Sequence, residues 1–328
     1  MPLFPTADTG PILRGRSAGM AVVTKKLVSG MVMLCASAVF VLATCQMLRN
    51  VEPFHTWYYS FAWWSVILFF QSVLYRRWGR AILFDNPLDF VRLLPVSVTV
   101  WLIFEAFNFR LQNWHYENLP SMTTVRLLGY TIAYATVLPG LFTARDLLER
   151  CGLWKNLRCR PLRAPQKLYR TLTALGLACG ILPLLWPRYF FPLVWGAFIF
   201  LLEPRNHRTG AGSLLRDWEN GSPRHFFLLL ASGLLCGLLW ELWNYWAGSR
   251  WVYTVPFVGG LKVFEMPLLG FLGFPPFAVE CYAMYCFTVA TWAKLGPARK
   301  VGLAFGVAAF DLLVFYGIDR LTVLSFSG

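Results

Sequence analysis

The sequence alternates between long apolar runs and short basic loops. Nine runs of about 17 to 25 mostly apolar residues are long enough to cross a bilayer as helices. They lie at 27–47, 57–75, 93–110, 126–144, 169–186, 189–204, 225–246, 267–290 and 301–319. The pattern predicts an all-α, polytopic integral membrane protein with about nine transmembrane helices.

Lysine and arginine are shared unevenly among the segments that join these runs. The N-terminal tail and the loops at 76–92, 145–170, 205–224 and 294–300 are basic, whereas the intervening loops carry one or two basic residues each. Because basic loops stay on the cytoplasmic side of a membrane, this alternation predicts a cytoplasmic N-terminus and an external C-terminus. We expect an integral protein of a bacterial inner (cytoplasmic) membrane.

The composition agrees with a membrane protein and argues against several other classes. Hydrophobic residues make up 57% of the chain and charged residues 14%, and the mean hydropathy is +0.52. The basic loops account for the formal net charge of +14, so we expect no nucleic-acid partner. The eight cysteines include no CxxC pair and the four histidines form no cluster, so we expect no metal and no cofactor.

A short pattern of polar and aromatic residues occurs once in each half of the chain. A Glu and an Asn lie three residues apart near the end of an apolar run, and a Trp-x-Tyr segment follows. The first copy consists of Glu105, Asn108, Trp114 and Tyr116, and the second of Glu241, Asn244, Trp251 and Tyr253. A Leu-Leu-Gly-aromatic segment then follows in both, ending at Tyr130 and at Phe271. The pattern indicates a duplicated unit whose two copies face one site.

The duplication also predicts how the chain is organised. The basic loops place both copies of the Glu on helices that run in the same direction, so the repeats are expected to be parallel. The expected parts are a cytoplasmic tail at 1–26, a first four-helix repeat at 27–148, a basic cytoplasmic connector at 149–168, a second four-helix repeat at 169–293, and a ninth helix with the C-terminus at 294–328.

Carboxyl groups inside membrane spans are the main candidates for chemistry. They cost free energy in an apolar surround, so they are functional candidates by default. A carboxylic acid in such a surround can stay protonated near neutral pH and donate a proton. Aromatic faces stabilise a carbocation by the same quadrupole that attracts ammonium ions. These residue types together favour proton-initiated chemistry on an apolar substrate.

We assign the candidate site residues on this basis. Glu241 is expected to be the acid, with Glu105 or Glu280 as its partner, and Asn108 and Asn244 one helical turn away are expected to orient the carboxylates. The residues expected to line a substrate cavity are Trp114, Tyr116, Trp240, Trp251, Tyr253, Glu265 and Asp311. The apolar segment after the seventh run is expected to fold back and cap that cavity.

Structural explanations exist for the same residues. A Glu-Asn turn near a helix end could bond a neighbouring helix, Glu265 could start a helix where the dipole favours negative charge, and the Trp and Tyr residues could anchor the chain at the membrane interface. A DxxxD match at Asp85 and Asp89 is similar to the magnesium motifs of intramembrane prenyltransferases. Pro87 interrupts it, and the loop before the seventh run has no full counterpart.

One segment resembles a known group of membrane enzymes. Trp240-Glu241, Trp251-Val-Tyr253, Gly259-Gly260, Glu265-Met-Pro267 and Glu280 together resemble the membrane lycopene cyclase domain and the related carotenoid hydratases. The Trp240-Glu241 element is also similar to that of fungal membrane meroterpenoid cyclases. The resemblance implies metal-independent, proton-initiated chemistry on isoprenoids. Here Glu265 precedes the proline, where the cyclase domain has a Pro-x-Glu-Glu element.

Three functions are consistent with these features. The first is an intramembrane enzyme that acts on an isoprenoid or other lipid taken from the bilayer, by carboxylate acid/base chemistry. The second is a proton-coupled transporter or channel, because repeats, broken helices and midplane acids also occur in carriers. The third is a membrane assembly protein without chemistry. We expect membrane lipids and a hydrophobic substrate as partners, and the sequence makes no prediction of oligomeric state.

Overall fold

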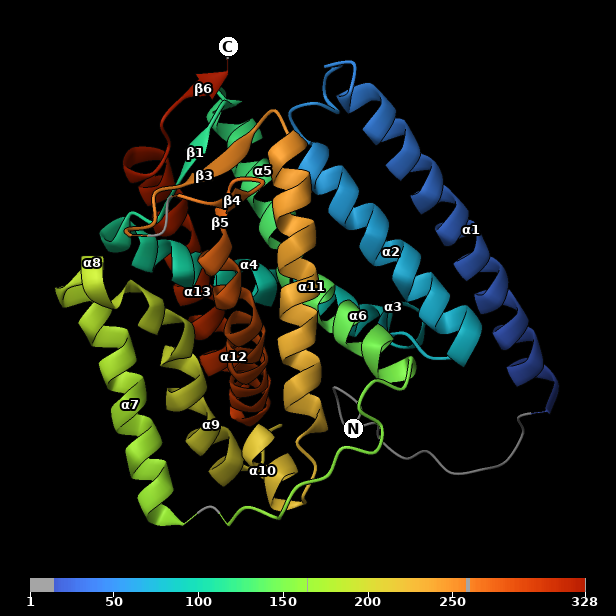
Figure 1. Ribbon diagram of the computed structural model, residues 1–328. Helices are drawn as coiled ribbons and strands as arrows, with labels where there is room; N and C mark the ends of the chain where they lie inside the picture. Colours follow the sequence, from blue (N-terminus) through green and yellow to red (C-terminus); the bar gives the residue numbers. More distant parts are fainter. Residues whose placement is uncertain (1–14, 164, 258–259, 328) are drawn as a thin grey trace.

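Long apolar helices make up most of the structure. The computed structural model describes residues 15–163, 165–257 and 260–327, so the tail at 1–14 and Gly259 lie outside the described residues (Figure 1). Within these ranges, seven helical segments are long and apolar enough to cross a membrane. They are Val23–Met47, Pro87–Leu111, Thr123–Arg150, Gln166–Leu185, Arg224–Trp246, Leu268–Lys294 and Pro297–Leu321. The predicted all-α class is confirmed, and these segments are consistent with an integral membrane protein.

Short helical turns and strands connect the longer helices. In chain order the longer helices are α1 (Gly15–Met47), α2 (Tyr58–Trp78), α4 (Pro87–Leu111), α5 (Thr123–Tyr134), α6 (Val137–Arg150), α7 (Gln166–Leu185), α9 (Ala197–Thr209), α11 (Arg224–Trp246), α12 (Phe274–Lys294) and α13 (Pro297–Leu321). The helical turns are α3 (Ile82–Asp85), α8 (Pro187–Phe190), η1 (Phe191–Gly196), α10 (Leu214–Glu219) and η2 (Leu268–Gly273). The strands are β1 (Trp114–Glu117), β2 (Leu119–Pro120), β3 (Arg250–Tyr253), β4 (Lys262–Val263), β5 (Met266–Pro267) and β6 (Phe326–Ser327). Pairing joins β1 to β3 and β4 to β5 in antiparallel fashion, and β2 to β6 in parallel.

Two of the nine predicted spans differ from the other seven. The run at 57–75 forms α2, whose Tyr, Trp, Ser and Gln side chains lower its hydropathy. The run at 189–204 is divided among α8, η1 and α9, and Pro192 lies in the first turn of η1. With 13 residues, α9 alone is too short for a bilayer. The count of nine spans and their arrangement in two parallel repeats remain predictions.

The predicted fourth span, 126–144, is broken rather than continuous. The first part, α5, ends at Tyr134, and α6 begins at Val137. Ser97 of α4 satisfies the backbone there, because its hydroxyl donates to the Tyr134 carbonyl (2.7 Å) and accepts from the Leu138 amide (3.0 Å). A polar side chain placed in this way allows a helix to break at membrane depth.

The predicted eighth span, 267–290, is also interrupted. It consists of η2 followed by α12, and Pro275 and Pro276 lie in the first turn of α12, where no intrahelical N–H is required. These prolines therefore mark a helix boundary within the predicted span. Glu265, which was expected to open the helix, precedes strand β5 instead.

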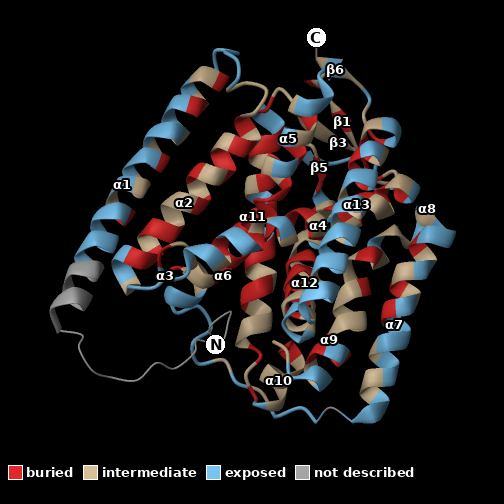
Figure 2. Ribbon diagram, turned by 180° about the vertical axis from the view of Figure 1, so that it is seen from behind, coloured by how far each residue is buried: buried red, intermediate tan, exposed pale blue. Residues whose placement is uncertain are grey.

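Three helices lie on the outside of the bundle. In α1, α7 and α13, 17% of the apolar window is buried, whereas the other four segments bury 44% to 61%. Figure 2 shows many exposed residues along α1, α7 and α13 and more buried residues along α11 and α12. Apolar surface of this extent suits contact with lipid chains.

The basic loops and the strands lie at opposite ends of the molecule. The connector between α6 and α7 and the turn α10 lie at one end, while β1, β3 and β6 lie at the other, beside the C-terminus (Figure 1). This separation agrees with the charge pattern used to predict orientation, and the orientation itself remains a prediction.

Labelling of single cysteines tests that orientation. In a variant whose exposed native cysteines are replaced by serine, we expect Asn118→Cys, beside the strands, to react with a membrane-impermeant maleimide added to intact cells. Arg158→Cys, in the basic connector, should react only after the cells are opened. Reaction of both positions from the same side would contradict the predicted orientation.

Candidate functional site

The two Trp-x-Tyr segments pair with each other to form one ribbon. In the antiparallel register of β1 and β3, Trp114 lies opposite Tyr253 and Tyr116 lies opposite Trp251. Opposite residues, and residues two apart on one strand, project from the same face of a sheet. All four aromatic side chains therefore share one face, and both copies of the motif contribute to a single surface.

Each Asn side chain, near the end of its helix, forms hydrogen bonds with the backbone of the strand that follows. Asn108 donates to the Trp114 carbonyl (2.8 Å), and its Oδ1 accepts from the Asn113 and Trp114 amides (2.8 and 3.3 Å). Asn244 makes the same pair of bonds to the carbonyl and amide of Trp251 (2.8 and 2.9 Å). The predicted role of orienting the carboxylates is thus indirect, because each Asn holds the strand whose Tyr bonds the Glu.

Glu105 is the more heavily hydrogen-bonded of the two repeated acids. Its Oε1 accepts from the indole N–H of Trp101 (2.8 Å), the indole N–H of Trp114 (3.1 Å) and, through a short contact, the hydroxyl of Tyr116. The hydroxyl of Tyr134 in turn donates to that of Tyr116 (3.1 Å). Three donors on one oxygen and a fully buried side chain hold this carboxyl in a fixed place.

Glu241 has a related but sparser set of contacts. Its Oε1 accepts from the Tyr253 hydroxyl (2.7 Å), which also accepts from the Trp251 indole (2.8 Å). This acid is also fully buried. In both Glu105 and Glu241, Oε2 is buried without a hydrogen-bond partner among the described residues. In both sites a buried Glu accepts a hydrogen bond from the Tyr of its strand, but Glu105 accepts hydrogen bonds from more donors than Glu241 does.

A cavity of about 150 Å³ lies against this ribbon. Its wall is mostly aromatic, and the two carboxyl groups lie behind that wall, bonded to its Trp and Tyr residues. Residues from both copies of the motif and from the Leu-Leu-Gly segments line it in pairs, namely Trp114 and Trp251, Tyr116 and Tyr253, and Gly129 and Gly270, and Trp57 and Trp195 line it as well. Other lining residues are Tyr59, Trp101, Arg126, Tyr130, Tyr134, Trp240, Arg250, Met266, Phe274 and Phe277.

The repeated glycines allow side chains to approach this wall closely. A Cβ atom at Gly129 would lie 2.3 Å from the ring of Trp57, and one at Gly270 would lie 2.2 Å from the sulfur of Met266. Only glycine permits such contacts. The glycines of the Leu-Leu-Gly segments that follow both motifs are therefore part of the cavity wall.

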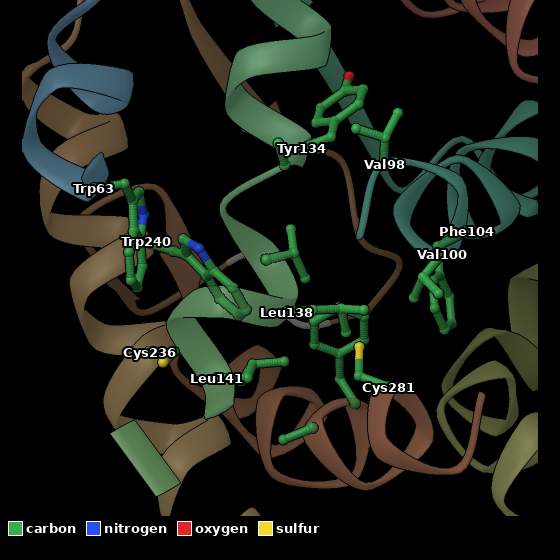
Figure 3. Close-up of a cluster of buried hydrophobic side chains, with 14 of the residues drawn as sticks. Trp63, Val98, Val100, Phe104, Tyr134, Leu138, Leu141, Cys236, Trp240 and Cys281 are labelled. Atoms are coloured by element: carbon green, nitrogen blue, oxygen red, sulfur yellow. The ribbon is translucent and has the colours of Figure 1, made fainter. Parts of the chain in front are cut away.

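Trp240 connects the cavity with the buried core. Its ring packs against Trp63 of α2, with ring centroids 5.6 Å apart. Figure 3 shows these two rings beside Leu138 and Leu141 of α6 and Cys236 of α11. The dense apolar packing supports the cavity wall from behind and makes this side of it rigid.

Burial sets the acid strength of the two ribbon tyrosines. Burial and the neighbouring carboxylate of Glu105 raise the pKa of Tyr116 well above its ordinary value, and burial and Glu241 do the same to the pKa of Tyr253. Both hydroxyls therefore keep their protons at neutral pH. The groups presented to the cavity are the tyrosine hydroxyls, with the carboxyl groups one hydrogen bond behind them.

Glu280 and Asp311 lie away from the cavity wall. Glu280 accepts from the backbone N–H of Phe198 at the start of α9 (2.8 Å), where helix N–H groups lack intrahelical partners. Asp311 accepts from the Thr99 hydroxyl on α4 (2.9 Å). The structure therefore does not bring these two predicted site residues to the ribbon.

Glu265 lies near the cavity without being part of its wall. Its carboxylate is 3.7 Å from the guanidinium of Arg250, and the next residue, Met266, lines the cavity. Within the part of the chain that the structure describes, no three His, Cys, Asp or Glu side chains come together as possible metal ligands.

Several cavity residues were not predicted from the sequence. Trp101 lies one helical turn before Glu105, and that spacing could have identified it. The other unpredicted rings are Trp57, Tyr59, Tyr130, Tyr134, Trp195, Phe274 and Phe277. Tyr130 ends the repeated Leu-Leu-Gly-aromatic segment. The other rings come from segments that no pattern in the sequence connects to the motif.

Removing an Asn side chain should loosen the ribbon. In Asn244→Ala, the partly buried backbone of Trp251 loses both side-chain partners, and we expect a loss of about 1–3 kcal/mol in the free energy of unfolding. Thermal unfolding followed by tryptophan fluorescence measures it. The exposed Asn220 provides a control, since Asn220→Ala should change stability by no more than about 0.5 kcal/mol. Equal effects of the two substitutions on stability would contradict the proposed role of Asn244 in holding the strand.

Glu280 should prove to be a structural residue. Glu280→Gln keeps an acceptor for the Phe198 amide, so stability should change little. Glu280→Leu leaves that amide without its partner and should cost about 1–3 kcal/mol of stability. Both variants are compared by thermal unfolding, and a Leu variant as stable as the parent protein would argue against this role.

Comparisons with known proteins assign no family. No protein-family profile matches the sequence, no curated protein is significantly similar to it, and no solved structure matches its fold. The resemblance of the segment from Trp240 to Glu280 to carotenoid cyclases and hydratases remains a prediction. Any function must therefore be argued from the cavity, its two carboxyl groups and their partners.

Proposed function

We propose that the protein is an intramembrane enzyme that isomerises or cyclises an apolar lipid, such as an isoprenoid, by moving protons. One observation carries the proposal: two buried Glu–Tyr pairs meet one aromatic cavity from the two strands of a single ribbon. An acid and a base on the same cavity are what a reaction needs if it adds a proton at one place and removes one at another.

The first step is a relayed proton transfer. The Tyr253 hydroxyl passes its proton to an alkene carbon of the substrate and takes a proton from the Glu241 carboxylic acid behind it. The π electron pair forms the new C–H bond, and a carbocation develops on the neighbouring carbon. Trp and Tyr faces of the wall stabilise that charge.

The second step removes a proton and closes the reaction. The cation is attacked by another double bond of the same molecule, or it keeps its skeleton. In either case it then loses a proton to the oxygen of Tyr116, which passes its own proton to the Glu105 carboxylate. The C–H electron pair becomes the new double bond. Neither oxidant nor reductant is consumed, and exchange of a proton with solvent restores both acids.

The unequal hydrogen bonding supports this division of roles. Glu105 receives three hydrogen bonds on one oxygen, and donors of this kind stabilise a carboxylate anion. Glu241 receives a bond from Tyr253. Environments that differ in this way divide acid and base roles between two carboxyl groups.

The ribbon also supports the proposed nine spans and two parallel repeats. An antiparallel pair of strands has a local twofold axis perpendicular to the ribbon, and in the register of β1 and β3 rotation about that axis carries Trp114 onto Trp251 and Tyr116 onto Tyr253. Parallel repeats are related by an axis along the membrane normal. The two axes coincide if the ribbon lies flat across the outer end of the bundle, with its aromatic face directed inward.

A carrier is the second candidate function, and one reason for it has weakened. The midplane acids Glu280 and Asp311 suggested proton coupling. Glu280 instead has a backbone partner at α9, which is a structural contact. Glu105 and Glu241 remain as the acids bonded to the cavity wall, and the proposed enzyme already gives each of them a role.

Substitution of the relay tests the proposal. Lipid extracts of cells with and without the protein identify the substrate as the species that accumulates in its absence. We expect Glu241→Gln and Tyr253→Phe each to lower turnover by about 10²–10⁴-fold, because neither side chain can relay a proton. Both keep the shape of the residue, so the protein should still fold and insert. Tyr245→Phe, at a residue 41% exposed, is the control and should retain full activity.

Full turnover in both relay variants would rule out Glu241 as the proton donor. That result would favour the carrier or the assembly protein over the enzyme. Loss of turnover together with loss of folded protein is distinguished from a catalytic effect by size-exclusion chromatography and thermal unfolding of the same samples.

A further inference from the structure

The cavity is surrounded by acidic groups although the whole protein is strongly basic. The chain carries a formal net charge of +14. Acids that bond or ion-pair with lining residues are Glu52, Glu105, Glu117, Glu241, Glu265 and Asp319. The basic residues in the lining are Arg126 and Arg250. Acids therefore outnumber bases around the cavity, in contrast to the basic loops at the other end of the molecule.

Both arginines already have acidic neighbours. Arg126 donates from Nε to Asp319 (2.9 Å) and from Nη1 to the carbonyls of Pro120 and Ser121 (2.7 and 2.9 Å). Arg250 lies between Glu117 and Glu265, with a guanidinium–carboxylate distance of 3.7 Å to each. An anionic ligand would have to compete with these carboxylates, so the cavity is a poor site for a phosphate or carboxylate group.

The aromatic wall favours positive charge for a separate reason. Six Trp and five Tyr residues line the cavity. The face of each ring carries negative charge density and attracts a cation, and Trp does so most strongly. The carboxyl groups of Glu105 and Glu241 lie behind the wall, and each has one oxygen without a hydrogen-bond partner among the described residues. The aromatic rings of the wall and the carboxyl groups behind it therefore both favour the binding of a cation.

We infer that the cavity binds organic cations, and that quaternary ammonium groups are its ligand class. An N–H-bearing ammonium needs hydrogen-bond acceptors, and this wall offers mainly rings. A quaternary ammonium has no N–H to satisfy, and its methyl groups fit an apolar surround. The inference goes beyond the proposed function, because a stable cation binds without reacting.

Choline and 3,3-dimethylbutan-1-ol form a matched pair of probes, identical in shape, with carbon replacing the charged nitrogen in the second. The protein is placed in nanodiscs of phosphatidylglycerol, which carries no choline head group, and binding is measured by calorimetry and by tryptophan fluorescence. We expect choline to bind about tenfold more tightly than its neutral isostere, in line with cation–aromatic attraction at a partly desolvated site.

Variants of the wall identify the groups responsible. Trp251→Leu removes a ring and should abolish the preference for choline, whereas Trp251→Phe keeps a ring and should retain most of it. Glu105→Gln removes the carboxylate charge behind the wall and should weaken choline binding while leaving the isostere unaffected. Trp292→Leu, at an exposed residue near the end of α12, is the control and should change neither affinity. The Phe and Gln variants keep the test decisive if the Leu variant fails to fold.

Equal affinities for choline and its isostere in the parent protein would overturn the inference. So would a choline preference that survives both Trp251→Leu and Glu105→Gln in folded protein. Failure here is separable from failure of the proposed enzyme. A choline preference combined with full lipid turnover in Glu241→Gln supports the cation site and removes the proton relay. Equal affinities for the two probes in the parent protein, combined with lost lipid turnover in Glu241→Gln, remove the cation site and support the proton relay.

Discussion

The hydrogen bonds from Asn108 and Asn244 to the strands that follow them are the contacts on which the rest of the site depends. Each fixes a Trp-x-Tyr strand at a helix end. The strands can then pair, and pairing brings four aromatic side chains to one face. Without these bonds, neither Tyr116 nor Tyr253 would be held against its buried carboxyl group.

The same constraint explains polar residues elsewhere in the bundle. A buried backbone group without a partner costs free energy, and a bilayer offers no water to supply one. Ser97 meets this need where α5 ends and α6 begins, and Glu280 does so at the start of α9. Glu203 accepts the amides at the start of α10. A buried acid in this protein is therefore as often a partner for backbone as a candidate for chemistry.

The sequence predicted what depends on local pattern and missed what depends on distant contacts. Run length and hydropathy predicted the long helices, and the repeated motif identified the residues of the ribbon. The pairing of β1 with β3 joins segments far apart in the chain, as does the approach of Trp195 to the cavity, and neither leaves a local signal. The bond from the Phe198 amide to Glu280 was not predictable either, because the position of that backbone group is determined only by the fold.

The two ribbon strands also show where the chain can change in length. Asn108 and its Trp partner are six residues apart, whereas Asn244 and its partner are seven apart, yet both pairs make the same contact. The segment between the helix and the strand can therefore gain or lose a residue while the Asn side chain still bonds to the backbone of the Trp. Within a strand the opposite holds, because a slip of one residue reverses which side chains face inward. His115 and Val252 would then replace the aromatic rings, so insertions are tolerated before the strands and excluded within them.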